Sequence, residues 1–137
     1  MAEEKKIGAI KEELQAAEDS MLPDFIARYE KDERSGVKSL VEKAGKRIQK
    51  LEAEYARIEN LKKYEKEYAD AGYICGIDEV GRGPLAGPVV AGAVILPKDC
   101  DILYINDSKK LSASMREKLY DEIMEKAVAT GIGMAGP

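Results

Sequence analysis

Hydrophobic residues near the start of the chain recur at steps of three and four positions. The series consists of Ile7, Ile10, Leu14, Ala17 and Met21. Such spacing places side chains on one face of an α-helix, so it predicts a helix over residues 7–21. We expect Pro23 to end or redirect this helix. A short second helix is predicted over residues 25–29, before a break at Ser35 and Gly36.

A longer helix is predicted from about Val37 to Tyr68. Its apolar positions again alternate steps of three and four, at Val41, Ala44, Ile48, Leu51, Tyr55 and Ile58. The register then slips, and the stripe continues through Leu61, Tyr64 and Tyr68. A slip disfavours a long regular coiled coil. We therefore expect a helical hairpin that folds back on residues 7–21, or docking of this helix on the downstream domain.

The pattern changes after residue 70 to short apolar runs bounded by Gly and Pro. Residues 73–77 and 89–96 are rich in β-branched residues and predict the two strands of a β-hairpin. Residues 131–135 predict a third strand. A helix is predicted between the second and third of these strands, and it is expected to end near Val128.

That last helix has several sequence signals at its ends. Ser112 and Ser114 are candidate N-caps, and Ser114 with Glu117 has the spacing of a capping box. Gly131 suits the left-handed position past the C-terminus. The side chains expected to be buried follow steps of four: Met115, Leu119, Ile123 and Ala127.

Composition excludes several classes of site. The chain has 137 residues, a net charge of −4 and no histidine. The missing histidine excludes a Ser-His-Asp triad and His-ligated zinc. The two cysteines, Cys75 and Cys100, are too few for a four-ligand zinc cluster, while a disulfide between them stays open. No apolar run has the length of a membrane span and no signal peptide is recognisable, which predicts a cytoplasmic protein without membrane association.

Two adjacent acids, Asp78 and Glu79, follow the first predicted strand. Ionised carboxylates beside a packed strand need a metal, an arginine or backbone N–H groups as partners. Glycines at 81, 83 and 87 let the backbone approach a ligand closely. A cation and a sugar-phosphate could therefore be held here. The alternative is a turn capped by the acids, with Arg82 as their salt-bridge partner.

The sequence around these acids resembles a known family. Residues 77–89 read I-D-E-V-G-R-G-P-L-A-G-P-V, and residues 106–112 read N-D-S-K-K-L-S. Together they resemble the type 2 ribonucleases H, specifically bacterial ribonuclease HII. Residues 32–37, D-E-R-S-G-V, resemble more weakly a D-x-R-x-G-V segment in the helical N-terminal extension of one subgroup. That weaker resemblance implies a substrate-binding or stabilising extension.

The resemblance implies a fold, an activity and a set of partners. The expected fold class is α/β: an all-helical extension over residues 1–70, then the first half of a ribonuclease H-like mixed sheet over residues 71–137. The implied activity is a metal-dependent endoribonuclease of DNA replication and repair. It cleaves the RNA strand of RNA–DNA hybrids, and cleaves 5′ of ribonucleotides embedded in duplex DNA, leaving a 3′-hydroxyl and a 5′-phosphate.

The resemblance also implies roles for individual residues. Asp78 and Glu79 match the first two of the family's four metal-ligating acids, for Mg²⁺ or Mn²⁺. Adjacent strand residues point to opposite faces, so both reach one metal only if the strand ends or kinks there, as Gly81 would permit. Gly81, Arg82 and Gly83 match the turn that contacts the ribose at the junction.

Basic residues supply further candidate contacts to substrate. Lys109 and Lys110 resemble phosphate-binding residues before a helix N-terminus, although they could be solvated lysines. Asp107 beside them is predicted to cap a turn. Between Lys38 and Lys50 five basic residues stand against one acid. The candidate contacts to a duplex backbone are Lys43, Lys46, Arg47 and Lys50, with a solvated helix face as the alternative.

In that family, the other two acids and a substrate-stacking tyrosine belong to a downstream half of the fold, beyond Pro137 of this sequence. We therefore expect this chain to be a fragment that has little or no nuclease activity alone and self-associates, whereas the full-length enzyme is expected to be a monomer. Two other functions stay open. One is a non-catalytic nucleic-acid-binding module, and the other is a helical interaction module formed by residues 1–70.

Overall fold

The computed structural model describes residues 5–83 and 86–136. The chain forms two compact units, Met1–Ala56 and Arg57–Pro137. Pro84 and Leu85, which lie between the two strands of the predicted hairpin, are outside the described residues. The domain division expected at residue 70 stays a prediction.

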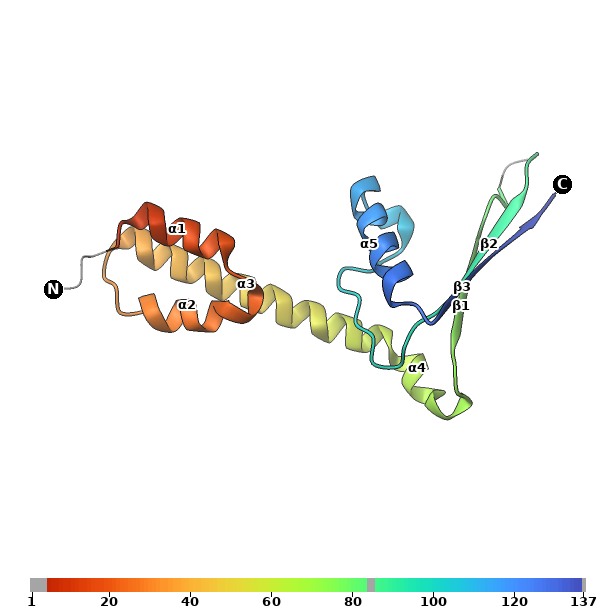
Figure 1. Cartoon of the computed structure of the whole chain (residues 1–137), viewed down its shortest axis with the longest axis horizontal. Helices are drawn as coiled ribbons and strands as arrows, with labels where there is room; N and C mark the ends of the chain where they lie inside the picture. Colours follow the sequence, from red (N-terminus) through yellow and green to blue (C-terminus); the bar gives the residue numbers. More distant parts are fainter. Residues whose placement is uncertain (1–4, 84–85, 137) are drawn as a thin grey trace. The chain divides into compact units, whose positions relative to one another are not determined.

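The first unit is a bundle of helices. Its elements are α1 (Ile7–Ala16), the 3-10 turn η1 (Asp19–Met21), α2 (Leu22–Tyr29) and the beginning of α3 (Ser35–Leu61) (Figure 1). Their apolar faces share one core, formed by Ile10, Leu14, Leu22, Phe25, Tyr29, Val37, Leu40 and Ala44. The predicted helical hairpin against residues 7–21 is therefore confirmed.

The ends of these helices differ from the prediction. Helix α1 stops at Ala16, because Ala17 adopts an extended conformation (φ −68°, ψ 130°). Pro23 does not end this helix; it lies in the first turn of α2, where a missing N–H costs no hydrogen bond. Ser35 begins α3 instead of forming a break. Gly36 lets α1 approach α3 closely, since an added Cβ would lie 3.0 Å from Ile7 Cδ1.

The prediction of a single helix as far as Tyr68 is wrong, because the helix is interrupted at Lys62. Helix α3 ends at Leu61, and Lys62 (φ −77°, ψ 8°) leaves the helical conformation before α4 (Lys63–Glu67). The 3-10 turn η2 (Ala69–Ala71) follows. This interruption coincides with the slip in the apolar register.

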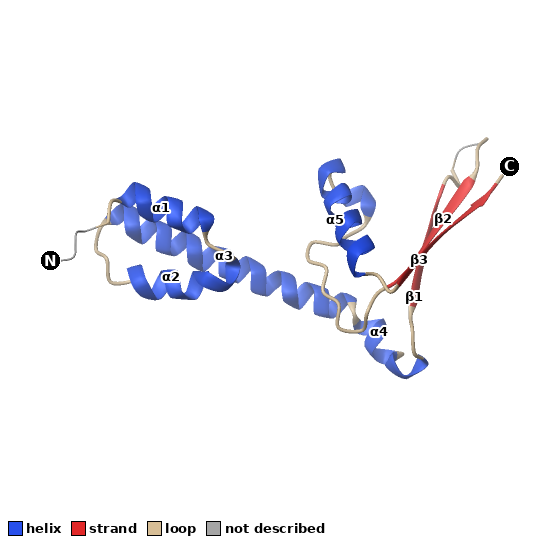
Figure 2. Cartoon of the chain, in the orientation of Figure 1, coloured by secondary structure: helices blue, strands red, loops and turns tan. Residues whose placement is uncertain are grey.

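The second unit contains a three-stranded sheet, drawn in red in Figure 2. Strands β1 (Cys75–Val80), β2 (Val89–Ile95) and β3 (Ala129–Ala135) pair antiparallel in the order β1-β2-β3. The predicted hairpin and third strand are confirmed. The α/β fold class is also confirmed, since a helical region is followed by a small sheet consistent with part of a ribonuclease H-like fold. The strands of the described residues pair antiparallel, so the expected mixed pairing is not seen among them.

Between β2 and β3 lie the 3-10 turn η3 (Ser108–Lys110) and helix α5 (Ala113–Lys126). Ser112 is the N-cap, and its hydroxyl accepts the N–H of Met115 at 3.3 Å. The capping box predicted from Ser114 is therefore wrong. Leu119 is buried as predicted, and its neighbours at steps of four are half-buried. Gly131 lies within β3 and does not cap α5, because Ala127 already adopts an extended conformation.

Much of the sheet is exposed. All described positions of β1 and β3 are exposed, including Ile77, Val80, Ile132 and Met134. Cys75 and Cys100 are both free, so the disulfide left open by the sequence is not formed. Among the helices of the described residues, none has the length and apolarity to cross a membrane.

Candidate functional site

The two candidate metal-binding acids lie inside strand β1. Asp78 pairs with Gly92 of β2, and Glu79 pairs with Ala91. The pairing continues through Val80, so the strand neither ends nor kinks at the acids, and that expectation is wrong. Because successive strand residues project to opposite faces, Asp78 and Glu79 belong to opposite faces of the sheet.

Both acids are exposed, and each makes one polar contact that an ion could replace or share. Asp78 Oδ1 accepts the backbone N–H of Glu79 at 2.9 Å. Glu79 Oε1 lies 3.9 Å from Arg82 Nη1, and the Arg82 side chain is 86% exposed. An ion pair that is this long and exposed contributes little free energy. The contact with Arg82 therefore leaves the carboxylate of Glu79 accessible to a ligand.

The space beside Asp78 is open. Cross-strand partners lie on the same face of a sheet, so the missing side chain of Gly92 is adjacent to the Asp78 carboxylate. A Cβ added at Gly92 would meet no heavy atom within 4 Å. The predicted motif did not include Gly92, although a glycine inside an apolar strand signals the close approach of another group.

The bend after β1 depends on Gly81. Its φ is +94°, and an added Cβ would lie 2.3 Å from the carbonyl oxygen of Pro88. Only glycine fits this position, so turn geometry alone accounts for Gly81. Arg82 and Gly83 follow as exposed residues, and nothing lies within 4 Å of a Cβ placed on Gly83.

Lys109 and Lys110 are held on a fixed turn. Asp107 caps η3 as predicted, since its Oδ1 accepts the N–H of Lys109 at 2.9 Å. Arg116 of α5 fixes the turn from the other side by donating to the carbonyls of Ser108 (3.3 Å) and Leu111 (2.7 Å). Both lysine side chains are exposed. Within the described part of the chain, no hydrogen bond or ion pair joins them to the acids of β1.

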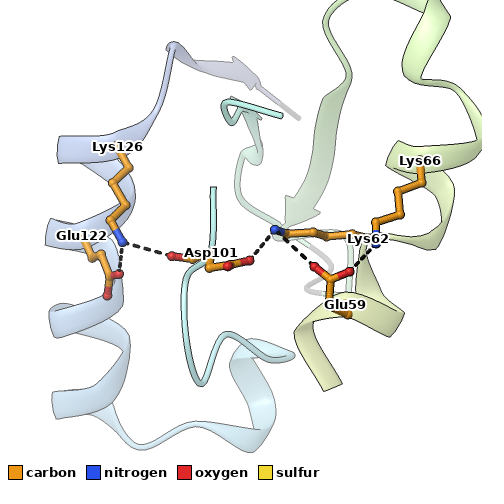
Figure 3. Close-up of polar contacts among 6 residues, drawn as sticks. All are labelled: Glu59, Lys62, Lys66, Asp101, Glu122 and Lys126. Atoms are coloured by element: carbon orange, nitrogen blue, oxygen red, sulfur yellow. Dashed lines mark hydrogen bonds and ion pairs between the residues drawn. The ribbon is translucent and has the colours of Figure 1, made fainter. Parts of the chain in front are cut away.

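A polar network that the sequence did not reveal fixes the loop before this turn (Figure 3). Asp101 lies between two lysines: Lys62 binds its carboxylate, and Lys126 of α5 donates to its backbone carbonyl at 3.0 Å. The hydrogen bond that Lys62 donates to Asp101 is the main cause that raises the pKa of Lys62. Glu122 and Glu59 also contact these lysines. Lys62 and Lys126 are 39 and 25 positions from Asp101 in the sequence, so no local sequence pattern predicts the network.

The candidate backbone contacts on α3 lie in the first unit. All four side chains, Lys43, Lys46, Arg47 and Lys50, are exposed. Lys46 pairs with Glu42 at 2.6 Å, and Arg47 pairs with Asp19 of η1 at 2.6 Å. The hydrogen bond from Lys46 lowers the pKa of Glu42. Among the described residues, neither Lys43 nor Lys50 has an ion-pair partner.

The D-x-R-x-G-V segment has a structural role in the same unit. Arg34 Nη2 lies 2.5 Å from Asp32 Oδ2, and Arg34 Nη1 donates to the Lys5 carbonyl at 3.0 Å. Val37 is fully buried. The segment thus ties the loop before α3 to the start of α1.

The donor chemistry of the β1 acids fits a hard divalent cation. Mg²⁺ and Mn²⁺ prefer oxygen ligands, and Mg²⁺ is often held by one or two carboxylates together with substrate phosphates and water. Within residues 5–83 and 86–136, no three His, Cys, Asp or Glu side chains gather as a metal site. Asp78 and Glu79 could therefore supply two oxygen ligands for such an ion, which is only part of a complete set.

Comparison with known proteins gives consistent matches along the chain. Residues 6–69 match the Ribonuclease HII N-terminal domain, and residues 75–134 match Ribonuclease HII. Ribonuclease HII of Lachnoclostridium phytofermentans is 59% identical over 130 residues, which cover 95% of this chain and 51% of that protein. The Bacillus subtilis protein of the same name is 50% identical over 127 residues, 91% of this chain and 49% of that protein.

The chain spans about half the length of the curated relatives that it matches. Among solved structures, the ribonuclease H2 from Pyrococcus horikoshii OT3 is 28% identical with a TM-score of 0.37, over 46% of this chain and 32% of that chain.

Proposed function

Because the chain belongs to the ribonuclease HII family, we propose that it forms part of a metal-dependent endoribonuclease. Its substrates are RNA–DNA hybrids and duplex DNA with embedded ribonucleotides, cut 5′ of the ribonucleotide to leave a 3′-hydroxyl and a 5′-phosphate. The observation that carries the proposal is the exposed Asp78–Glu79 pair on a folded strand of the matching region. The proposed setting is cytoplasmic DNA replication and repair.

Asp78 and Glu79 are the proposed ligands of Mg²⁺ or Mn²⁺. Because they belong to opposite faces of β1, both reach one ion only if the end of the strand rearranges at Gly81 when the ion binds. When bound, such an ion activates water and neutralises charge on the attacking and leaving oxygens of the phosphodiester. Asp78 offers an oxygen beside the open space over Gly92. Glu79 needs only to leave its weak contact with Arg82.

The bend and η3 are the proposed contacts to substrate. Gly81 shapes the bend so that Arg82 and Gly83 present their backbone to the ribose, whose 2′-hydroxyl distinguishes RNA from DNA. Gly83 has the open space that such an approach requires. Lys109 and Lys110 then bind phosphate from the turn held by Asp107 and Arg116.

These residues supply two carboxylates, so we expect little or no turnover from the 137-residue chain by itself. The two functions that compete with catalysis make different predictions. A non-catalytic binding module would bind duplex without any effect of divalent ions, and a helical interaction module would dimerise through residues 1–70 without binding DNA.

The test of the proposed activity uses a chimera. The chain is joined to the remaining segment of the Lachnoclostridium phytofermentans relative, which this chain covers over 51% of its length. Cleavage of a duplex with one embedded ribonucleotide is measured with Mg²⁺ or Mn²⁺. We expect cleavage 5′ of the ribonucleotide, reduced at least 100-fold by Asp78→Asn and unchanged by Asp121→Asn, an exposed acid of α5. Equal cleavage by the Asp78→Asn chimera would refute the proposal.

A further inference from the structure

We propose that Arg57, near the end of α3, is a positioning residue that places Lys109 and Lys110 for contact with a phosphate of the substrate. It acts through the bend formed by Tyr104 and Ile105, which precedes η3 in the chain. The inference rests on the proposed nuclease function, because that function supplies the phosphate. It gives a role to a residue that belongs neither to the acid pair of β1 nor to the lysine turn.

Arg57 makes a charge-assisted hydrogen bond to the loop before η3. Its Nη2 donates to the carbonyl oxygen of Ile105 at 2.8 Å, and this contact is partly buried. The neighbouring side chains of Ile58 and Ile102 are each 3% exposed, so both segments are anchored by packing. A hydrogen bond from a charged donor is stronger than a neutral one, and partial burial protects it from competing water. This bond therefore fixes the Ile105 carbonyl.

The bend that Arg57 holds has a strained backbone. Tyr104 has a φ of +66°, in the left-handed region that residues other than glycine rarely adopt. Such a conformation persists only where the surrounding contacts enforce it. The carbonyl that accepts the Arg57 bond belongs to the next residue along the chain. Loss of this bond would let the backbone at Tyr104 relax toward a commoner conformation.

Short hydrogen bonds connect the bend to the two lysines. Asn106 Oδ1 accepts the backbone N–H of Asp107 at 2.9 Å, and the Asp107 carbonyl accepts the N–H of Lys110 at 2.8 Å. Asp107 Oδ1 also accepts the N–H of Lys109 at 2.9 Å. The chain from the bend to η3 is thus linked residue by residue. A displacement of the bend therefore shifts both lysines away from the position in which they meet a phosphate.

A direct contact between Arg57 and phosphate is the competing explanation, because Arg57 is itself a cation. The two explanations differ in additivity. A positioning residue acts only through Lys109 and Lys110, so its replacement costs no affinity once both lysines are absent. A direct contact would keep its own contribution of about −0.9 to the slope of log K against log salt.

The test is a double-mutant cycle on the 137-residue chain. Affinity for a ribonucleotide-containing duplex is measured by fluorescence anisotropy over a range of salt concentrations, in EDTA so that no metal-dependent cleavage occurs. We expect Arg57→Gln to weaken binding at least about threefold and to reduce the magnitude of the slope by no more than about 1.8, the value for two lost lysine contacts. In a Lys109→Gln, Lys110→Gln background, Arg57→Gln should change neither affinity nor slope. Arg57→Lys, which keeps a charged donor, should retain the wild-type slope.

The charge-matched control is Lys118→Gln, which removes an exposed cation of α5 and should leave binding close to that of the wild type. Amide hydrogen exchange without nucleic acid gives a second measurement, in which the Lys109 amide should exchange faster in Arg57→Gln and not in Lys118→Gln.

Three results would each overturn the proposal: a loss of affinity from Arg57→Gln that persists without the two lysines, an equal loss in Lys118→Gln, or unchanged exchange at Lys109 in Arg57→Gln. A different result would identify a failure of the proposed function. If Lys109→Gln with Lys110→Gln alone left affinity and slope unchanged, the phosphate contacts themselves would be refuted, and this inference with them.

Discussion

Asp78 of β1 lies directly opposite Gly92 of β2, and the position of the missing Gly92 side chain is open space. The two residues share one face of the sheet, where the carboxylate would otherwise be next to a strand side chain. Glycine weakens a strand because it adds entropy to the unfolded chain and packs nothing. Its presence in an otherwise apolar strand is explained if the space beside Asp78 must stay accessible.

A side chain placed in the open space at Gly92 should weaken metal binding without destabilising the fold. Gly92→Leu places an apolar side chain beside Asp78 without meeting any atom within 4 Å at its Cβ. We expect a melting temperature no lower than that of the wild type, and weaker Mn²⁺ binding measured by electron paramagnetic resonance. Gly131→Leu on the other face of the sheet is the matched control and should bind Mn²⁺ normally. Full Mn²⁺ affinity in Gly92→Leu would argue against a site at this face.

Gly81 should be far less tolerant than Gly83. Gly81→Ala introduces a Cβ 2.3 Å from the Pro88 carbonyl at a φ of +94°, whereas the same change at Gly83 meets open space. We expect Gly81→Ala to reduce the free energy of unfolding by at least about 1 kcal/mol, the cost of a strained backbone position. Gly83→Ala should be close to neutral. Urea denaturation of both variants measures the difference, and equal stabilities would contradict the geometry of the bend.

Periodicity predicts the helices of the first unit, because the apolar stripes that it detects are the surfaces that pack. The core residues Ile10, Leu14 and Ala44 all belong to predicted stripes. Helix ends were less predictable. Pro23 is compatible with the first turn of a helix as well as with a break, and only tertiary packing decided between them.

Acid should destabilise the helical unit through Glu13. Its carboxylate accepts hydrogen bonds from Lys5, from Arg28 Nη1 at 2.5 Å and from Tyr29 Oη at 2.8 Å. The hydrogen bond from Lys5 is the main cause that lowers the Glu13 pKa from 4.5. A lowered pKa in the folded state stabilises the protein above pH 4.5, and this contribution is lost as the pH falls through the folded pKa.

The corresponding measurement is urea unfolding as a function of pH, with Glu13→Gln and, as control, the exposed Glu12→Gln. Glu13→Gln should be less stable at pH 7 and should lose less stability below pH 4.5 than the wild type. The Glu12→Gln variant should follow the wild-type curve. If Glu13→Gln followed the wild-type curve too, the three contacts would contribute nothing.

The Lys62–Asp101 pair should hold the loop before η3. The Lys62 side chain is 17% exposed and that of Asp101 39%, so we expect about 1 kcal/mol after allowing for solvent screening. Lys62→Gln should then speed amide hydrogen exchange in residues 97–105 about fivefold. Lys63→Gln, at the exposed start of α4, is the control. Exchange that is unchanged in Lys62→Gln would show that other contacts hold the loop.

The sequence predicts only part of the candidate site. The motif predicts Asp78, Arg82 and Lys109 as site residues, but it does not predict that the acids lie within β1, because strand pairing extends one residue beyond them to Val80. The Lys62–Asp101 contact joins residues 39 positions apart. No local pattern encodes such a contact, so only the folded chain reveals it.

Mn²⁺ binding to the 137-residue chain, saturated with a ribonucleotide-containing duplex, tests most directly whether Asp78 is a metal ligand of a nuclease site. Electron paramagnetic resonance of free Mn²⁺ gives the affinity for the wild type, Asp78→Asn and the surface control Asp121→Asn. We predict at least about tenfold weaker binding in Asp78→Asn, equivalent to a loss of about 1.4 kcal/mol, with the control unchanged. Equal Mn²⁺ affinity in all three proteins would contradict the assignment of Asp78 as a ligand.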